Sequence, residues 1–259
     1  MKRMSLGLFA CGMFMVVLIG CSVKEDRNVC PGRLELDLSG IDDAFGSVDL
    51  LGSGPGGVVF RDVVTMPLSE DIYMREVPHG MLDVNVWYGA GECINEEQGI
   101  VIPLGEECPP LYMHSFVADT RGEIYRKRVE LHKNYCCLTL KMKGMDRVPY
   151  GLSVRGNVDG YRLDGSPRRG EFCRAVGPQG WAEVMVRVPR QMDASLMLEV
   201  DDGYGVRKSL AIGEYIVASG YNWDSEDLSD VTVTIDYYIT YLTVMVQKWD
   251  EEYVFDLVL

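Results

Sequence analysis

The chain of 259 residues is short of positive charge: 25 lysines and arginines stand against 39 aspartates and glutamates, and the formal net charge is −14. The first twenty residues hold basic Lys2 and Arg3 and no acidic residue, so the remainder is more acidic still. A surface of this charge repels phosphate backbones and anionic lipid headgroups. Composition therefore argues against nucleic acid as a partner.

Motifs of catalysis and metal binding are missing too. The sequence has no Gly-x-Ser-x-Gly, His-Glu-x-x-His or Cys-x-x-Cys motif, and His79, His114 and His132 are scattered. The glycine-rich residues 52–57 lack the Lys-Ser/Thr of a phosphate-binding loop, so we interpret them as a hairpin. Residues 224–230 are acidic but lack the central glycine of an EF-hand loop, which favours a solvated turn over calcium. We predict no enzymatic activity, cofactor, metal or small-molecule substrate.

The sequence has only one long apolar run, over residues 6–20. This run is shorter than the ~20 residues of a membrane-spanning helix. Lys2 and Arg3 precede this run and the small Gly20 ends it, which is the layout of a secretory signal peptide over residues 1–20. We therefore expect no membrane-spanning helix in the mature chain.

Residues 18–21, Leu-Ile-Gly-Cys, resemble the lipobox of bacterial lipoproteins. The resemblance implies cleavage before Cys21 and acylation of that cysteine, and several acyl chains on one residue hold a domain stably at a membrane. The other interpretation is a secreted protein in which Cys21 lies near the cleavage point by chance. Lys24, Glu25 and Asp26 resemble the tags that carry Bacteroides-type lipoproteins to the outer face of the outer membrane, although a polar tether has the same composition.

Of the eight cysteines, Cys11 lies in the predicted signal peptide and Cys21 at the predicted lipidation site, which leaves six. An even number permits disulfides and agrees with an oxidising compartment. Six cysteines allow 15 complete pairings, so the sequence does not choose among them. Cys93 and Cys108 flank a turn-rich segment and form the favoured disulfide pair. Cys136 and Cys137 are adjacent in a predicted strand, so their side chains point to opposite faces and we expect one buried and one exposed thiol.

Alternation of apolar and polar residues dominates the rest of the chain and predicts strands with one buried face. The apolar positions are Leu34, Leu36 and Leu38; Val84, Val86 and Tyr88; Leu138, Leu140 and Met142; Leu196, Leu198 and Val200; and Val231, Val233, Ile235 and Tyr237. No segment of helical length shows apolar residues at the spacing i, i+3, i+4, i+7. Short strands separated by turns predict an all-β protein of two tandem sandwiches, one over residues 21–131 and one over residues 132–259. Four tryptophans fit a sandwich core better than a sugar-binding platform: Trp87, Trp181, Trp223 and Trp249.

The order of several segments resembles the FimB-type fimbrial anchor subunits of Bacteroidales. These segments are residues 21–27, Cys30-Pro31 with the strand at 34–37, residues 78–89, 129–133, 160–165, 220–223 and 230–236, and a closing Trp249. The resemblance covers essentially the whole mature chain. It implies two transthyretin-like Greek-key sandwiches, a lipidated N-terminus, and a role in fixing a fimbrium to the outer membrane together with stalk or tip fimbrillin subunits.

Related fimbrillins polymerise by strand donation, and the resemblance implies that an anchor keeps its own first strand and offers its last. Arg27 and Arg33 lie near the first strand, where an Arg-specific protease cuts stalk subunits. The predicted partner strand presents Tyr253, Phe255, Leu257 and Leu259 on one face. The same alternation equally fits the last strand of the second sandwich. An alternative function is a surface lipoprotein that binds glycans or host proteins.

Overall fold

A computed structural model describes residues 30–67, 71–95, 97–143, 151–176, 183–201, 207–236, 241–246 and 252–256. The chain divides into Met1–Pro31 and Gly32–Leu259, and all the elements below lie in the second unit. The strands are β1 (Gly32–Asp37), β2 (Ser47–Gly54), β3 (Gly57–Thr65), β4 (Ile72–Val77), β5 (Met81–Tyr88), β6 (Ile94–Asn95), β7 (Gly99–Val101), β8 (Tyr112–Asp119), β9 (Ile124–Arg128), β10 (His132–Lys133), β11 (Tyr135–Lys143), β12 (Gly151–Tyr161), β13 (Pro167–Val176), β14 (Glu183–Pro189), β15 (Met197–Asp201), β16 (Arg207–Leu210), β17 (Val231–Asp236), β18 (Tyr241–Val246) and β19 (Glu252–Asp256). The helices are α2 (Ile212–Ala218) and the 3-10 turns η1 (Asp43–Phe45) and η2 (Gly91–Cys93).

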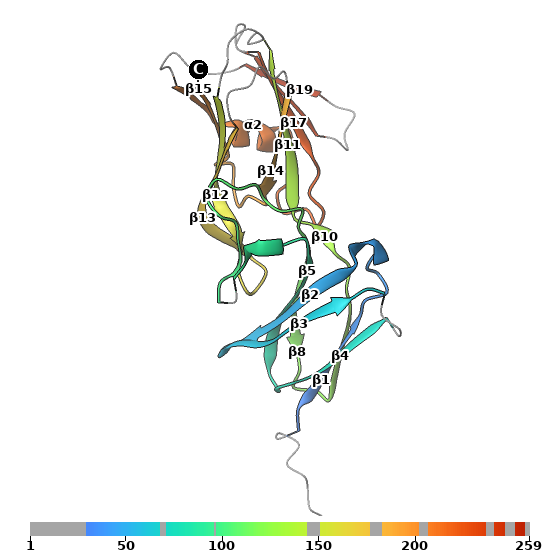
Figure 1. The fold of residues 1–259 in the computed structure, drawn as a ribbon. Helices are drawn as coiled ribbons and strands as arrows, with labels where there is room; N and C mark the ends of the chain where they lie inside the picture. Colours follow the sequence, from blue (N-terminus) through green and yellow to red (C-terminus); the bar gives the residue numbers. More distant parts are fainter. Residues whose placement is uncertain are drawn as a thin grey trace, which may run out of the picture. The chain divides into compact units, whose positions relative to one another are not determined.

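The first sandwich packs the sheet β4-β1-β9 against the sheet β10-β8-β5-β2-β3 (Figure 1). Its core takes the inward side chains of both sheets, among them the fully buried Leu34, Leu36 and Leu50. The β2–β3 hairpin turns at Pro55-Gly56, so the glycine-rich residues form the predicted hairpin.

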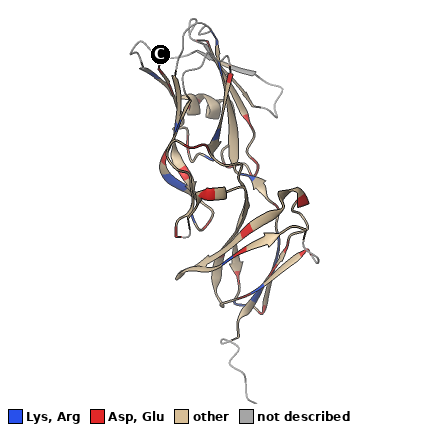
Figure 2. Cartoon of the chain, viewed as in Figure 1, with Lys and Arg blue, Asp and Glu red and all other residues tan. Residues whose placement is uncertain are grey.

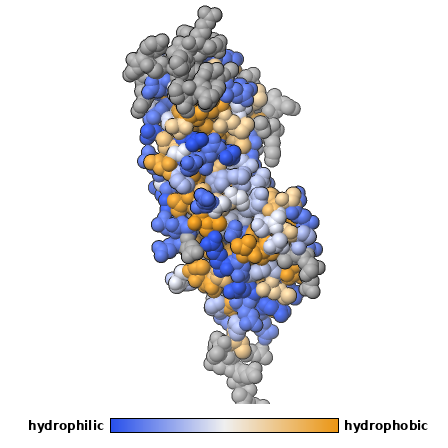
Figure 3. All heavy atoms as spheres, viewed as in Figure 1, coloured by the Kyte–Doolittle hydropathy of each residue, from blue (hydrophilic) through white to orange (hydrophobic). Residues whose placement is uncertain are grey.

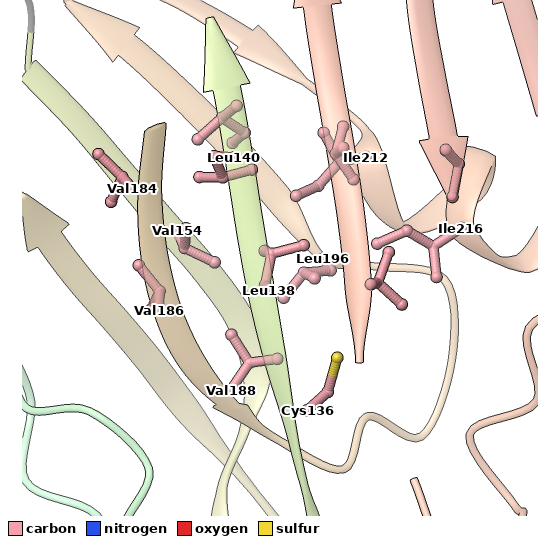
Figure 4. Close-up of a cluster of buried hydrophobic side chains, with 14 of the residues drawn as sticks. Cys136, Leu138, Leu140, Val154, Val184, Val186, Val188, Leu196, Ile212 and Ile216 are labelled. Atoms are coloured by element: carbon pink, nitrogen blue, oxygen red, sulfur yellow. The ribbon is translucent and has the colours of Figure 1, made fainter. Parts of the chain in front are cut away.

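The second sandwich packs the sheet β14-β11-β17-β18-β19 against a sheet built on β12, with β13, β15 and β16. Figure 4 shows side chains of β11, β12 and β14 in one cluster with those of α2, with Leu138 and Leu140 of β11 near its centre. The helix α2 places Ile212 and Ile216 in this core. Its seven residues give fewer than two full turns of helical periodicity, which is why the sequence pattern did not reveal it.

The two sandwiches repeat one topology of seven strands. In each, the first strand lies between an antiparallel and a parallel neighbour, β1 between β4 and β9 and β11 between β14 and β17. In the first sandwich, β2 pairs with β3 and β5, and β5 also pairs with β8. In the second sandwich, β12 pairs in the same way with β13 and β15, and β15 also pairs with β16. Among the described strands of the first sandwich, β18 and β19 have no counterpart.

A short hairpin crosses between the sandwiches. The strands β6 and β7 follow β5 in the chain, yet β7 pairs with the end of β12, matching Gly160 with Val101 and Tyr161 with Ile100. At Gly160 the backbone has a φ of +145°, and a Cβ there would lie 1.9 Å from the carbonyl oxygen of Ile100. Glycine is therefore required for this close pairing.

The predicted strands are present in the described residues, and the predicted position Tyr237 falls outside them. The expectation that one face of every strand meets water was wrong, above all for β5. The outer face of β5 is not exposed to solvent, since Asn85 and Trp87 are 1% and 3% exposed. Both residues lie against the second sandwich, as described below. Within the described residues, no helix has the length and apolar character needed to cross a membrane.

Candidate partner-binding strands and the junction between the sandwiches

The first strand is in place in this chain and forms the centre of its sheet. β1 pairs along its whole length with β4 on one side and from Arg33 onward with β9 on the other. Leu34 and Leu36 on its inner face are fully buried. A strand held on both edges and by its core side chains leaves no open groove at this position.

The outer face of β1 is fixed by a buried carboxylate. Glu35 is 7% exposed and accepts hydrogen bonds from Nε of Arg126 at 2.5 Å and Nε of Arg33 at 2.8 Å. The hydrogen bond from Arg126 is the main cause that holds the pKa of Glu35 below its ordinary value. Arg33 thus belongs to the folded sheet, and its backbone N–H donates to the carbonyl of Glu123 at 3.0 Å.

The C-terminal strand β19 is the end strand of its sheet. It pairs with β18 alone among the described strands, with Thr243 opposite Val254. Val254 is 65% exposed. Tyr253 and Phe255 lie in β19, while Leu257 and Leu259 fall outside the described residues. Because β18 and β19 are additional to the repeated strands, the predicted partner strand belongs to an appended hairpin.

The junction between the sandwiches has a small core of its own. Its buried members come from the outer face of the first sandwich, the loop after β5, β7 and β12: Leu51, Trp87, Ala90, Ile100, Leu111, Met113 and Tyr161. Asn85 adds a hydrogen bond from its side-chain amide to the carbonyl of Leu163, in the turn after β12. The alternation of β5 therefore serves two cores, one on each face.

Tyr161 is the hydrogen-bonding centre of this junction. Its hydroxyl donates to the carbonyl of Asn134 at 2.5 Å and accepts from the backbone N–H of Arg190 at 3.2 Å. Burial raises the pKa of Tyr161, so this hydroxyl stays protonated. The Arg190 side chain donates to the carbonyls of Trp223 and Ser225 and to the side chain of Asn134. The segments around residues 134, 161, 190 and 223 are thereby joined.

The chain matches known proteins in structure but not in sequence. No family model matches it, and no curated protein matches it in sequence. Solved structures do match: a candidate polysaccharide-binding protein from Bacteroides thetaiotaomicron is 12% identical, with a TM-score of 0.60 over 88% of this chain and 98% of that chain. The fimbrial anchor protein Mfa2 from Porphyromonas gingivalis is 10% identical, with a TM-score of 0.58 over 85% of this chain and 98% of that one.

The chain shares the fold of a fimbrial anchor protein. A candidate adhesin from Bacteroides ovatus has the same fold, with a TM-score of 0.56 at 13% identity over 86% of this chain and 96% of that chain. The predicted all-β class and the sandwich architecture are thereby confirmed. The division at residues 131 and 132 stays a prediction, as β10 pairs with β8 of the first sandwich and β7 with β12 of the second.

The predicted anchor and export residues lie outside the described part of the chain. This applies to Cys21 and to Lys24, Glu25 and Asp26, whose roles stay predictions. The helical and strand elements described above begin after them, at Gly32.

The six cysteines of the described residues are free thiols, and the Cys93–Cys108 pair stays a prediction. Burial raises the pKa of Cys108, and Cys93 lies near enough to add to that shift. Cys136 is buried in the second core, where burial raises its pKa to about 12, while Cys137 is half-buried on the other face of β11. Cys136 and Cys137 therefore point to opposite faces as predicted, but Cys137 is half-buried and not exposed as expected.

Two of the histidines are neighbours, which their sequence spacing did not indicate. The rings of His114 and His132 lie 5.9 Å apart between centroids, because β10 pairs with β8. The backbone N–H of Glu130 donates to Nδ1 of His114 at 3.0 Å, and burial lowers the pKa of His114. In the described residues no group of three metal-ligating side chains forms around them.

Two of the four tryptophans belong to buried clusters. Trp87 lies in the junction core and Trp223 in the second core, and each is at most 5% exposed. Trp181 and Trp249 fall outside the described residues. A sugar platform requires an exposed ring face, so the core interpretation holds for Trp87 and Trp223.

Proposed function

We propose that this chain is an outer-membrane lipoprotein that anchors a fimbrium, or is a minor structural subunit of one, and faces the cell exterior. The observation that carries the proposal is the fold, shared over 98% of the fimbrial anchor protein Mfa2. The lipobox at Cys21 supplies the attachment to the membrane, and fimbrillin stalk or tip subunits are the partners.

The arrangement of strands supports a direction for assembly by strand donation. A chain that accepts a donor strand needs an open groove, and β1 fills that position here with partners on both edges. The appended β18–β19 hairpin instead offers a terminal strand that is additional to the repeated sandwich. The proposed anchor therefore donates its C-terminal strand and accepts none at β1.

Replacing Cys21 by alanine is expected to move the full chain from the detergent phase to the aqueous phase and to remove the acyl mass. The reason is that several acyl chains on this residue would supply all the membrane affinity of a domain with an acidic surface. Detergent partition and intact mass of the two proteins, expressed in a Gram-negative host, make the measurement. A wild-type protein that stays aqueous and carries no acyl mass contradicts the proposed anchor.

Replacing Lys24, Glu25 and Asp26 together by alanine is expected to keep the lipid but to hide the protein from protease added outside the cells. A receptor reads such a tag, so the change acts on export and leaves the fold untouched. Detergent partition serves as the control that lipidation is intact. Equal cleavage of the variant and the native protein in whole cells would show that these residues are only a tether.

Glycan binding is the second candidate function, and it is favoured by one structural match and by one surface pocket. The match is the candidate polysaccharide-binding protein from Bacteroides thetaiotaomicron. The pocket, of about 470 Å³, is lined by polar groups able to hydrogen-bond sugar hydroxyls, including Asp83, Gln98 and Arg162. Neighbouring genes for a nutrient-uptake porin and glycosidases favour this function, whereas genes for other lipidated sandwich subunits favour the anchor.

A further inference from the structure

Two pockets on the outer face of the first sandwich form one continuous cleft beside the second sandwich. One is the pocket of about 470 Å³ described above, and the other has a volume of about 500 Å³. Gly57, Glu97 and Leu163 line both of them, and the two together are here called the junction cleft. Its floor is formed by β2, β3 and β5. Its walls are the turn between β6 and β7 and the turn between β12 and β13.

The turn between β6 and β7 is fixed by side-chain hydrogen bonds. Oδ1 of Asn95 accepts the backbone N–H groups of Glu97 and Gln98, each at 3.0 Å. Arg168 of β13 donates to the side chain of Gln98, and its Nε and Nη2 donate to Asp159 at 2.8 Å and 2.6 Å. This wall is therefore held in place against the second sandwich.

The turn between β12 and β13 is fixed in the same way. The carbonyl of Leu163 accepts hydrogen bonds from the side chains of Asn85 and Ser53, which lie in the floor. Within the turn, the backbone N–H of Ser166 donates to Oδ1 of Asp164 at 2.9 Å. Walls that are held before a ligand arrives lower the entropic cost of binding it.

The larger-lined, polar end of the cleft, which is the 470 Å³ pocket, has a surplus of negative charge. Of its two arginines, Arg168 is paired as described above, and Arg162 lies near enough to Asp164 to stabilise its charge. Within the described residues, Asp83 and Glu97 form no ion pair. Figure 2 shows further acidic residues on both sandwiches. Such a site repels acidic sugars, whereas neutral sugars can donate their hydroxyl groups to its carboxylates.

The other end of the cleft, which is the 500 Å³ pocket, is aliphatic. Leu51, Val58 and Leu163 supply its apolar surface, and its Arg61 lies 3.8 Å from the carboxylate of Asp49. None of its described lining residues is aromatic, so this end offers no ring on which the face of a sugar could stack. Hydrophobic side chains reach the surface among polar ones on the face in Figure 3. The aliphatic end fits a small apolar substituent.

Glu97 lies where the two ends meet, because it lines both pockets. A carboxylate accepts hydrogen bonds and donates none, so it fits an N–H or O–H group of a ligand. An acetamido group carries one N–H and one methyl group side by side. It therefore matches a carboxylate that borders an aliphatic surface. A free amino group would match the carboxylate but leave the aliphatic end without a partner.

We propose that the junction cleft binds a neutral oligosaccharide that contains an N-acetylated amino sugar. The acetyl methyl group would lie in the aliphatic end, the amide N–H would donate to Glu97, and hydroxyl groups would fill the polar end. The inference rests on glycan binding, the second candidate function, and names the class of sugar. Because the floor and walls come from both sandwiches and from the crossing hairpin, the site needs the assembled junction.

The first test compares four disaccharides that share one β1–4 skeleton, by saturation-transfer difference NMR with the full chain. They are N,N′-diacetylchitobiose, its de-acetylated form, cellobiose and cellobiuronic acid. The first is expected to bind, with the strongest transfer at the acetyl methyl groups, and the other three at least about tenfold more weakly. Equally strong binding of any of these three overturns the class of sugar but leaves glycan binding in place. No binding of all four overturns both.

The second test locates the bound sugar with two variants of β3. Val58→Lys is expected to remove the acetyl methyl signal, because the long side chain fills the aliphatic end and brings its charge to Glu97. The matched control is Val63→Lys on the same strand, which is 63% exposed and lines neither pocket, and it is expected to bind as the native chain does. Circular dichroism controls for folding. Equal signals from both folded variants would show that the sugar binds elsewhere and overturn the proposal.

Discussion

Tyr161→Ala is expected to lower the free energy of unfolding by about 3–5 kcal/mol, the usual cost of removing a buried aromatic side chain. Tyr161 is 1% exposed and packs with Trp87 and Met113 in the junction core. Its loss also leaves the carbonyl of Asn134 without the hydroxyl that donates to it. Urea unfolding, followed by tryptophan fluorescence and by circular dichroism, measures the change.

The matched variant Tyr161→Phe keeps the ring and removes only the hydroxyl, so we expect a loss of about 1 kcal/mol. The two variants together separate packing from hydrogen bonding. In Tyr161→Ala we further expect the two spectroscopic transitions to separate, because the junction core joins the sandwiches. Coincident transitions and an unchanged midpoint in that variant would show that the junction contributes little to stability.

Deleting Tyr253–Leu259 is expected to leave the melting temperature nearly unchanged while capture of a fimbrial stalk subunit is lost. The strand β19 pairs with one described neighbour, and the hairpin it belongs to is absent from the first sandwich, which folds into the same seven strands without it. Differential scanning fluorimetry and pull-down of a purified stalk subunit make the two measurements.

A shorter truncation after Asp256 is the matched control, since it removes Leu257 and Leu259 but keeps the β19 backbone. If this variant captures less stalk subunit but keeps the melting temperature of the full chain, Leu257 and Leu259 bind in the groove of the partner. A core strand behaves differently: exposing several large apolar side chains should cost on the order of several kcal/mol. A strongly destabilised or insoluble deletion would therefore exclude the donor role and leave β19 as the last strand of the second sandwich.

The strands and their inner faces could be predicted from the sequence because alternation is a local signal. Leu34 and Leu36, and likewise Leu138 and Leu140, are fully buried as predicted. The order of strands in the sheets is set by pairings between distant segments, which alternation does not encode. The repeated topology became visible only from those pairings.

The junction between the sandwiches was missed for a related reason. Alternation at Asn85 and Trp87 indicates a face but not whether water or another sandwich covers it. Trp87 and Tyr161 are apolar enough to suggest burial, yet nothing in their sequence spacing connects them.

The crossing of β6 and β7 also constrains how the chain reaches its folded state. These strands are synthesised with the first sandwich, but their partner at Gly160 and Tyr161 emerges later. A chain growing from its N-terminus therefore completes the first sandwich with this hairpin still unpaired, and pairing it requires closure of a long loop. Neither half expressed alone would be complete, because one would hold an unpaired hairpin and the other would lack a strand.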